Sequence, residues 1–256
     1  MTRIIKAEIL KYMLEMKNYY PDYVGGFILT LLFFLIFFSK IDVTKDSNEI
    51  LILVIGFTYW FFSSNSISQM SVSISEEKQV GTFEQLLLKP ISIEKILMIR
   101  TFCWNFISLI IVMIVYCLSI FIFSIKINFN FNFFLLLLIY FFTLISFIGI
   151  AYILASATLV YSKTASFSSI IQYILLFTSG AIIPLDSLPN WVAILAKLIP
   201  LSHSINLSVI VLMNKQLQIY YIICFIFLCL FYFFIGLIIF KYSIKKAFVE
   251  GINSKF

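Results

Sequence analysis

The sequence predicts an all-α membrane protein, and its composition is the first reason. Of the 256 residues, 62% are hydrophobic and only 12% are charged, and the mean hydropathy is +1.07. Soluble domains carry about 25% charged residues. The apolar residues also occur in long blocks, which are typical of helices that cross a lipid bilayer. A single membrane domain therefore accounts for residues 1–256.

Six apolar blocks are predicted to be transmembrane spans. They cover residues 23–39, 50–74, 101–125, 133–161, 165–183 and 218–240. In this layout thirteen Lys and Arg residues lie on the side of the N-terminus and five lie on the opposite side. Cytoplasmic loops are enriched in these residues, so both termini are predicted to be cytoplasmic, in a protein of the cell membrane. The net charge of +6 has the same explanation and does not indicate nucleic-acid binding.

The first segment, residues 1–21, is predicted to be an amphipathic helix that lies on the membrane surface. Its apolar side chains recur every three or four residues and form one face, at Ile5, Ile9, Tyr12, Met16 and Tyr19. Acidic and basic residues occupy the rest of the helix, as in helices that lie between lipid and water. Pro21 is expected to end this helix.

The second predicted span is polar in its last half. Candidate path-lining residues lie there, at Ser64, Asn65, Ser68 and Gln69. Small hydroxyl residues also let helices approach closely in lipid, and Asn and Gln hydrogen-bond to neighbouring helices. Helix packing is therefore favoured over a transport path as the role of these residues.

Residues 76–100 form a polar stretch between the second and third predicted spans, EEKQVGTFEQLLLKPISIEKILMIR. Thr82 and Gln85 have the capping-box spacing, in which each side chain satisfies a backbone N–H at a helix start. Pro90 cannot continue that helix. Ser92 is suited to begin a second short helix. The stretch is predicted either to dock a soluble partner or to be an amphipathic connector that rests on lipid headgroups.

Residues 184–214, between the fifth and sixth predicted spans, are divided by Pro184, Pro189 and Pro200. The resulting apolar pieces are too short to cross a membrane. Two short helices are expected to dip back into the outer leaflet, with Trp191 at headgroup depth.

Several kinds of chemistry lack support in the sequence. No GxxxxGK[ST] nucleotide-binding pattern occurs, and no charged residue lies in the central part of a predicted span, which argues against an ion-coupled transporter. The four cysteines have no metal-ligand spacing, so no metal site is expected. A membrane enzyme that acts on lipid-linked substrates through His203 and Asp186 is a minor hypothesis.

Two stretches carry a resemblance to a known family. The central one reads as acidic residues, Gly-Thr, an apolar residue, Glu, an apolar run and Pro. The second, PLDSLPNWVAILAKLIPLSHSI, contains Leu-Pro-x-Trp and Pro-Leu-x-His elements. Both are similar to patterns in permease subunits of the type-2 ATP-binding-cassette export family, as are the six-span layout and the N-terminal helix. Members often have an arginine soon after the second element. Ile205–Met213 contains none, which leaves the substrate subgroup open.

The resemblance implies a permease that is not itself an enzyme and binds no cofactor. Two copies of a separate ABC ATPase would bind ATP and Mg²⁺, and a second permease chain, identical or related, would complete the exporter in the lipid. The central stretch would hold the coupling helix, with Phe83 as an apolar anchor and Glu84 as a charge for the ATPase. The expected coupling residues are Gly81, Thr82, Phe83, Glu84, Gln85 and Pro90.

The substrate class that suits this interpretation is an amphiphile, namely a drug, a peptide, a lipid or a lipid-linked glycan. The alternative function is that of a membrane accessory, immunity or assembly protein that transports nothing. Docking of an ATPase on residues 76–100 separates the two hypotheses.

Overall fold

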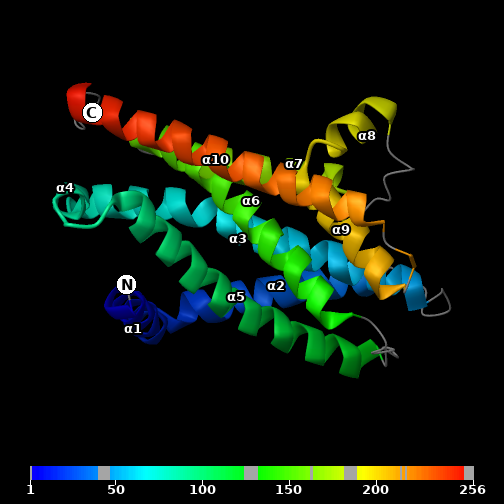
Figure 1. Cartoon of the computed structure of the whole chain (residues 1–256). Helices are drawn as coiled ribbons and strands as arrows, with labels where there is room; N and C mark the ends of the chain where they lie inside the picture. The colour runs from blue at the N-terminus through cyan, green and yellow to red at the C-terminus, as the bar shows by residue number, and fades with distance from the viewer. Residues whose placement is uncertain are drawn as a thin grey trace.

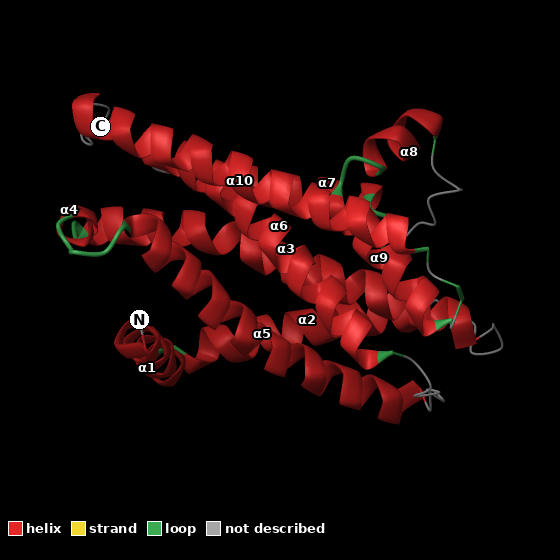
Figure 2. Ribbon diagram, in the orientation of Figure 1, coloured by secondary structure: helices red, strands yellow, loops and turns green. Residues whose placement is uncertain are grey.

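The computed structural model describes residues 2–39, 47–123, 132–161, 164–181, 189–213, 215, 216 and 218–250, which form helices joined by turns (Figures 1 and 2). The helices are α1 (Thr2–Asn18), α2 (Tyr20–Ser39), α3 (Ser47–Val80), α4 (Phe83–Leu87), α5 (Ile93–Phe123), α6 (Phe133–Val160), α7 (Ala165–Thr178), α8 (Asn190–Ala196), α9 (Pro200–Leu212) and α10 (Ile219–Glu250). No strand occurs in these described ranges. The prediction of an all-α protein is confirmed.

Several of these helices are long and apolar enough to cross a membrane. Three qualify alone, over Ile93–Ile114, Phe134–Val160 and Ile219–Ala247. Two pairs qualify only as bent units, Ile5–Asn18 with Tyr20–Ile36 at 89° and Asn190–Ala196 with Pro200–Leu212 at 85°. By length and composition the described residues thus hold three to five candidate spans. The protein is multi-pass, and the six-span layout stays a prediction.

Two predicted spans differ from the helices that form. The span predicted over residues 50–74 is part of a longer helix, α3, which continues to Val80. The span predicted over residues 165–183 is shortened to α7, whose 14 residues extend about 21 Å, less than a hydrocarbon core of about 30 Å. The chain turns after α7, where Gly180 adopts a positive φ of 83°.

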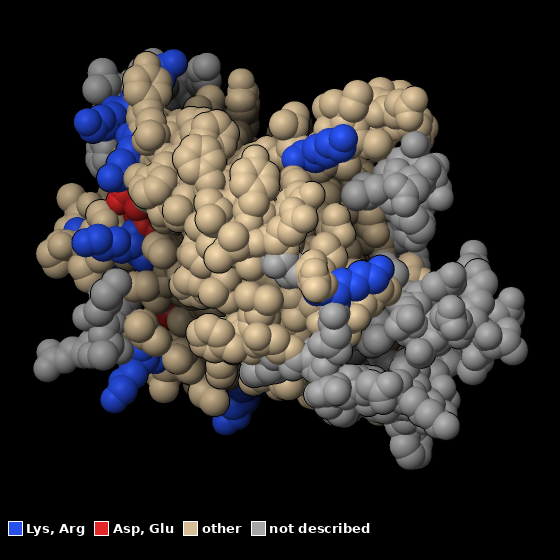
Figure 3. Space-filling model, turned by 45° about the vertical axis from the view of Figure 1, so that its right-hand side comes forward, with Lys and Arg blue, Asp and Glu red and all other residues tan. Residues whose placement is uncertain are grey.

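The start of α1, the end of α10 and the short helix α4 lie at one end of the molecule, at the left of Figure 1. All visible Asp and Glu and most visible Lys and Arg gather toward this end, and a wide uncharged band covers the middle (Figure 3). We call it the charged end. Such a distribution is typical of a protein whose middle faces lipid and whose ends face water.

The tightest helix contact joins α6 to α10. A Cβ placed on Gly149 would lie 2.3 Å from the carbonyl oxygen of Tyr232, and a Cβ on Gly236 would lie 2.0 Å from that of Gly149. Only glycine permits such an approach of two backbones. Because α6 also packs against α3 and α9, this contact fixes the centre of the molecule.

Helices α8 and α9 are the two short helices predicted from the proline pattern. Pro189 immediately precedes α8, and Pro200 occupies the first turn of α9, where its missing N–H is tolerated. α9 packs against α3, α6 and α10. Its Ser208 hydroxyl lies 2.8 Å from the hydroxyl of Tyr59, so polar as well as apolar contacts bury it. The depth of these helices in a membrane stays a prediction.

The glycine contact predicts a steric cost for any added side chain. Gly149→Ala places a methyl group against the α10 backbone, so we expect a loss of about 1–3 kcal/mol in the free energy of unfolding. Gly25→Ala is the matched control, because a Cβ at Gly25 meets nothing within 4 Å. Thermal unfolding in detergent compares the two variants. Equal midpoints for the two variants would contradict the contact.

Candidate functional site

The polar stretch between α3 and α5 forms a break around one short helix. Gly81 follows α3 with a positive φ of 76°, a conformation that glycine adopts without steric cost. α4 covers Phe83–Leu87, and Pro90 lies in the bend after it. The second short helix expected after Ser92 is wrong, because Ile93–Phe123 is one continuous helix.

The capping box predicted at the start of α4 does not form. The Thr82 side chain makes no capping hydrogen bond to α4. Its hydroxyl donates instead to the carboxylate of Glu77 in α3, and more weakly to the Glu77 carbonyl at 3.4 Å. The ionised carboxylate is the stronger acceptor. Gln85, the other half of the predicted box, is exposed. The Thr82 hydrogen bond thus connects the segment between α3 and α5 to the end of α3.

The side chains of α4 divide into a buried and an exposed face. Phe83 is only 3% exposed and packs in a core made by α3, α5, α6 and α10. The expectation that Phe83 is an anchor for a partner does not hold, because this side chain lies inside its own chain. Glu84 and Gln85 are exposed, as expected. Leu88, which sequence reasoning missed, is 85% exposed directly after α4.

Lys78 of α3 connects this break to α6. Its Nζ donates to the carbonyl oxygens of Thr158 at 3.1 Å and Leu159 at 2.8 Å, near the C-terminal end of α6. A cation is favourable there because the last helical carbonyls lack backbone partners. The same Nζ lies 5.8 Å from the ring centroid of Phe83. Burial lowers the pKa of Lys78.

Arg100 of α5 is the centre of a buried network that joins α1, α3 and α5, which we call the Arg100 network. Arg100 is 5% exposed. Its Nε lies 3.2 Å from Glu8 Oε1 of α1, and its Nη2 lies 2.8 Å from Glu77 Oε1 of α3. Its Nη1 donates to Ser73 Oγ at 2.7 Å. A planar guanidinium with five donors suits several acceptors at once.

The two carboxylates of this network have different surroundings. Burial alone would raise the pKa of Glu77, but hydrogen bonds from Thr82 and Arg100 and the charge of Arg100 hold it below its ordinary value. Glu8 is buried, and its Oε2 has no hydrogen-bond partner among the described residues. One cation therefore serves two carboxylates, and both lose their counter-charge if it is removed.

The apolar face predicted for α1 is divided between the inside of the protein and its outer surface. Ile5 and Ile9 are exposed, whereas Glu8 and Tyr12 are buried, with Tyr12 packed against α5. The exposed apolar side chains suit a helix whose outer side contacts lipid. Pro21 lies in the first turn of α2, so it begins the next helix and does not end α1.

The candidate path-lining residues of α3 form hydrogen bonds within the chain. Ser64 Oγ donates to Gln172 Oε1 of α7 at 2.9 Å. Ser68 Oγ donates to the carbonyl oxygens of Ser64 at 3.1 Å and Asn65 at 3.3 Å. Gln69 Nε2 donates to a hydroxyl of α1 at 3.0 Å. The contacts to α1 and α7 support the helix-packing explanation, and a role in a path stays a prediction.

The single histidine of the chain, His203, makes a contact between neighbouring short helices. His203 Nε2 lies 2.7 Å from the carbonyl oxygen of Lys197, across the turn between α8 and α9. Asp186, its suggested partner, lies outside the described residues. In the part of the chain that the structure describes, no three His, Cys, Asp or Glu are grouped to hold a metal ion. The geometry gives no support to catalysis at His203.

The Arg100 network predicts a large loss of stability when its cation is removed. Arg100→Met leaves Glu8 and Glu77 buried without a counter-charge, so we expect a loss of about 3–5 kcal/mol in the free energy of unfolding. Replacing both acids by Gln in the Arg100→Met background leaves no buried charge and should recover much of the loss. Thermal unfolding in detergent measures both variants. A triple variant no more stable than the single one would contradict the network.

The lowered pKa of Glu77 predicts a loss of stability in acid. Its ordinary value is 4.5, so the ionised group stabilises the fold above that pH, and this contribution is lost as the pH falls through the folded pKa below 4.5. The thermal midpoint, measured between about pH 7 and pH 3.5, should fall more steeply for the wild type than for Glu77→Gln. Identical pH profiles for the two proteins would be evidence against the pairing.

Comparison with known protein families adds independent evidence. A family model described as ABC-2 type transporter matches residues 2–213, which include α1, the α4 break, α8 and α9. No curated protein matches the chain. Permeases of this family generally work with an ABC ATPase as partner. The chain therefore belongs to the ABC-2 type transporter family, as a permease that crosses the membrane several times.

Proposed function

We propose that this chain is the membrane permease of an ATP-driven exporter and that α4 is its coupling helix. Two ABC ATPase subunits, which hold the ATP and Mg²⁺, would bind at the charged end. A second permease chain, identical or related, would complete the path through the cell membrane. The observation that carries the proposal is the α4 break, which in a chain of this family presents an exposed Leu88 beside polar residues.

The exposed face of α4 has the composition of a docking surface. Leu88 is surrounded in sequence by the exposed polar residues Glu84, Gln85 and Lys89. An apolar side chain ringed by polar contacts is the usual pattern of an interface hot spot. Lipid can cover the exposed apolar residues of the long helices. α4, in contrast, lies at the charged end, which is expected to face water (Figure 1). A soluble protein is the partner that suits Leu88 there.

A displacement of α4 would reach the membrane helices because α4 is fixed to them. Phe83 packs in a core shared with α3, α5, α6 and α10. Thr82 binds Glu77, which leads through Arg100 to α1. Close-packed interiors transmit strain rather than absorb it. Closure of the ATPases on ATP would therefore move α1, α5 and α6 together and change the gap between two permeases.

The remaining parts of the proposal are topology and cargo. The start of α1, the end of α10 and α4 share the charged end, which is consistent with a cytoplasmic location for all three (Figure 1). The substrate would be an amphiphile that moves outward. If the chain binds no ABC ATPase, the accessory, immunity or assembly function becomes the better explanation.

The docking surface predicts a specific loss of ATPase binding. Leu88→Ala should weaken binding of the ABC ATPase encoded beside the permease by about tenfold, as expected when a hot-spot side chain is truncated. Binding is measured by co-purification and titration in detergent. Leu198→Ala is the matched control, because Leu198 is another exposed leucine, in the turn between α8 and α9. Unchanged binding by Leu88→Ala would refute the role of this surface.

Phe83→Ala is a less informative variant than Leu88→Ala. It removes a buried ring, so a loss of about 3–5 kcal/mol in stability is expected whatever the partner. Loss of ATPase binding in this variant is therefore interpreted only where thermal unfolding shows that the protein is folded. Leu88→Ala removes a side chain that touches little of its own chain and avoids this problem.

A further inference from the structure

One side of α1 carries lysines and apolar side chains together. Lys6, Leu10, Met13 and Lys17 follow one another at intervals of four, three and four residues, so they lie along one side of the helix. All four side chains are exposed, Leu10 to 62% and Met13 to 65%. Lys6 and Lys17 lie about 17 Å apart along the helix axis, with the apolar pair between them. We call this surface the outer face of α1.

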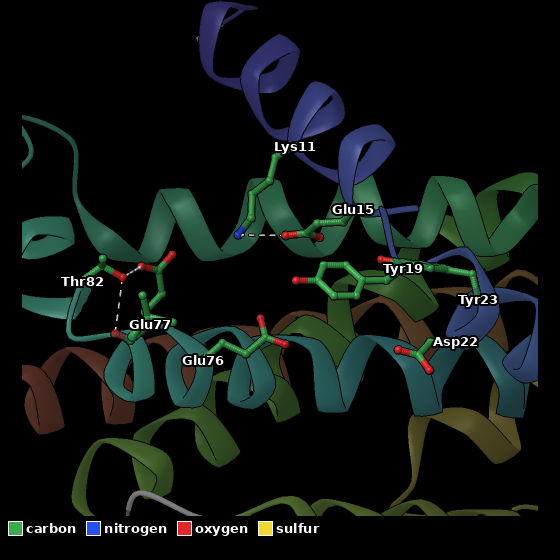
Figure 4. A pocket seen from close by; sticks show the side chains of 9 residues that line it. Lys11, Glu15, Tyr19, Asp22, Tyr23, Glu76, Glu77 and Thr82 are labelled. Carbon is green, nitrogen blue, oxygen red and sulfur yellow. Dashed lines mark hydrogen bonds and ion pairs between the residues drawn. The ribbon is translucent and has the colours of Figure 1, made fainter. Parts of the chain in front are cut away.

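The acidic side chains of α1 lie on its other side. Glu8 is buried, and its Oε1 lies 3.2 Å from the Arg100 Nε. Glu15 lines a cavity of about 630 Å³ between α1, α2 and α3, and its Oε1 lies 3.6 Å from the Lys11 Nζ (Figure 4). These are the two acidic residues of Thr2–Asn18. The outer face therefore carries positive charge without any negative charge.

The two outer lysines are not neutralised by the protein. Neither Lys6 nor Lys17 forms an ion pair with any residue that the structure describes. A lysine can lay its alkyl stem along apolar surface while its ammonium group stays in polar surroundings. The partner that suits the outer face is therefore anionic where it meets the lysines and apolar where it meets Leu10 and Met13.

The bend between α1 and α2 indicates where the outer face lies. The two helices meet at 89°, and α2 contains the first predicted span. If α2 crosses the bilayer, α1 lies along the surface of the bilayer. The start of α1 belongs to the charged end, next to the uncharged band in the middle of the molecule (Figures 1 and 3). Lipid headgroups occupy this boundary in a membrane.

We infer that the outer face of α1 is a binding surface for the headgroups of anionic phospholipids in the inner leaflet. Lys6 and Lys17 would pair with the headgroups, and Leu10 and Met13 would insert beside the acyl chains. The phosphate of a zwitterionic lipid is accompanied by a cationic amine, so its headgroup has no net charge. An anionic lipid is therefore held more tightly by the two lysines.

Lipid bound to the outer face would also stabilise the contacts on the inner side of α1. Glu8 is paired there with Arg100 of α5. The Tyr12 hydroxyl accepts a hydrogen bond from Gln69 of α3 at 3.0 Å. Lysines held by the headgroups would keep α1 in the position that these contacts require. The inference goes beyond the proposed function, because α1 would bind lipid with or without an ATPase.

Trp104 of α5 provides a local reporter of lipid beside α1. The centroid of its ring lies 5.5 Å from that of Tyr12 in α1 and 6.0 Å from that of Tyr23 in α2. Its side chain is only partly buried. Since the chain has three tryptophans, Trp60→Phe with Trp191→Phe leaves Trp104 as the single one. Brominated lipids that lie beside it quench its fluorescence.

The test compares quenching by brominated phosphatidylglycerol and brominated phosphatidylcholine, with the purified permease in nanodiscs and no ATPase. The ratio of the two association constants is the lipid preference. It should favour phosphatidylglycerol about 20-fold, because each lysine near an anionic surface contributes about fivefold. Lys6→Gln with Lys17→Gln should remove most of this preference. Lys241→Gln with Lys245→Gln removes the same charge from exposed positions of α10 and should leave it unchanged.

Three results would overturn the inference. Equal quenching by the two lipids in the wild type would show that the outer face does not select anionic headgroups. An equal fall in the two double variants would show an effect of net charge and not of α1. Quenching by neither lipid would show that a second permease or another protein covers α1.

A measurement without lysine variants keeps the test valid if the variants are unstable. Raising the salt concentration from about 0.05 M to about 0.5 M should lower the preference, because salt screens exposed charges. An unchanged preference would contradict the inference. ATPase binding through Leu88 without a lipid preference would count against this surface and not against the exporter. A lipid preference in a chain that binds no ATPase would count against the exporter alone.

Discussion

The position of α1 depends on one buried cation, Arg100. Its guanidinium holds Glu8 of α1 and Glu77 of α3, and through Glu77 it reaches Thr82 at the α4 break. Apolar contacts cannot replace this fixation, because lipid is as good a neighbour for an apolar side chain as another helix is. Polar contacts therefore determine which face of α1 turns inward, and the apolar side chains Ile5 and Ile9 are left outside.

The side chains around α4 separate into a buried group and an exposed group, and the two groups have different proposed roles. Phe83 packs α4 against α6, and Lys78 of α3 bonds to the end of α6, whereas Leu88 is exposed. A coupling helix requires a buried face that is packed firmly against the membrane helices and an exposed face that binds the ATPase, because movement of the ATPase must be transmitted to the membrane helices. The proposed docking residue, Leu88, thus lies directly after the five-residue helix whose buried Phe83 would transmit the movement.

Most polar side chains of α3 are satisfied by neighbouring helices, which makes the exceptions informative. Ser64 and Gln69 bond to α7 and α1, and Ser73 bonds to Arg100. Ser71, between Gln69 and Ser73, is buried and its hydroxyl has no hydrogen-bond partner among the described residues.

Composition and local spacing are sufficient for the helical membrane class, the helix at the N-terminus, the break at Gly81 and the two short helices set by Pro189 and Pro200. Each depends only on neighbouring residues: a glycine conformation, a missing N–H or a run of apolar side chains. Only the tertiary structure decides the partners of Arg100, of which Glu8 is 92 residues away in sequence. It also decides that Phe83 faces inward and Leu88 outward. Periodicity identifies the faces of a helix, but in a membrane both protein and lipid accept an apolar face, so hydrophobicity alone cannot select the buried one.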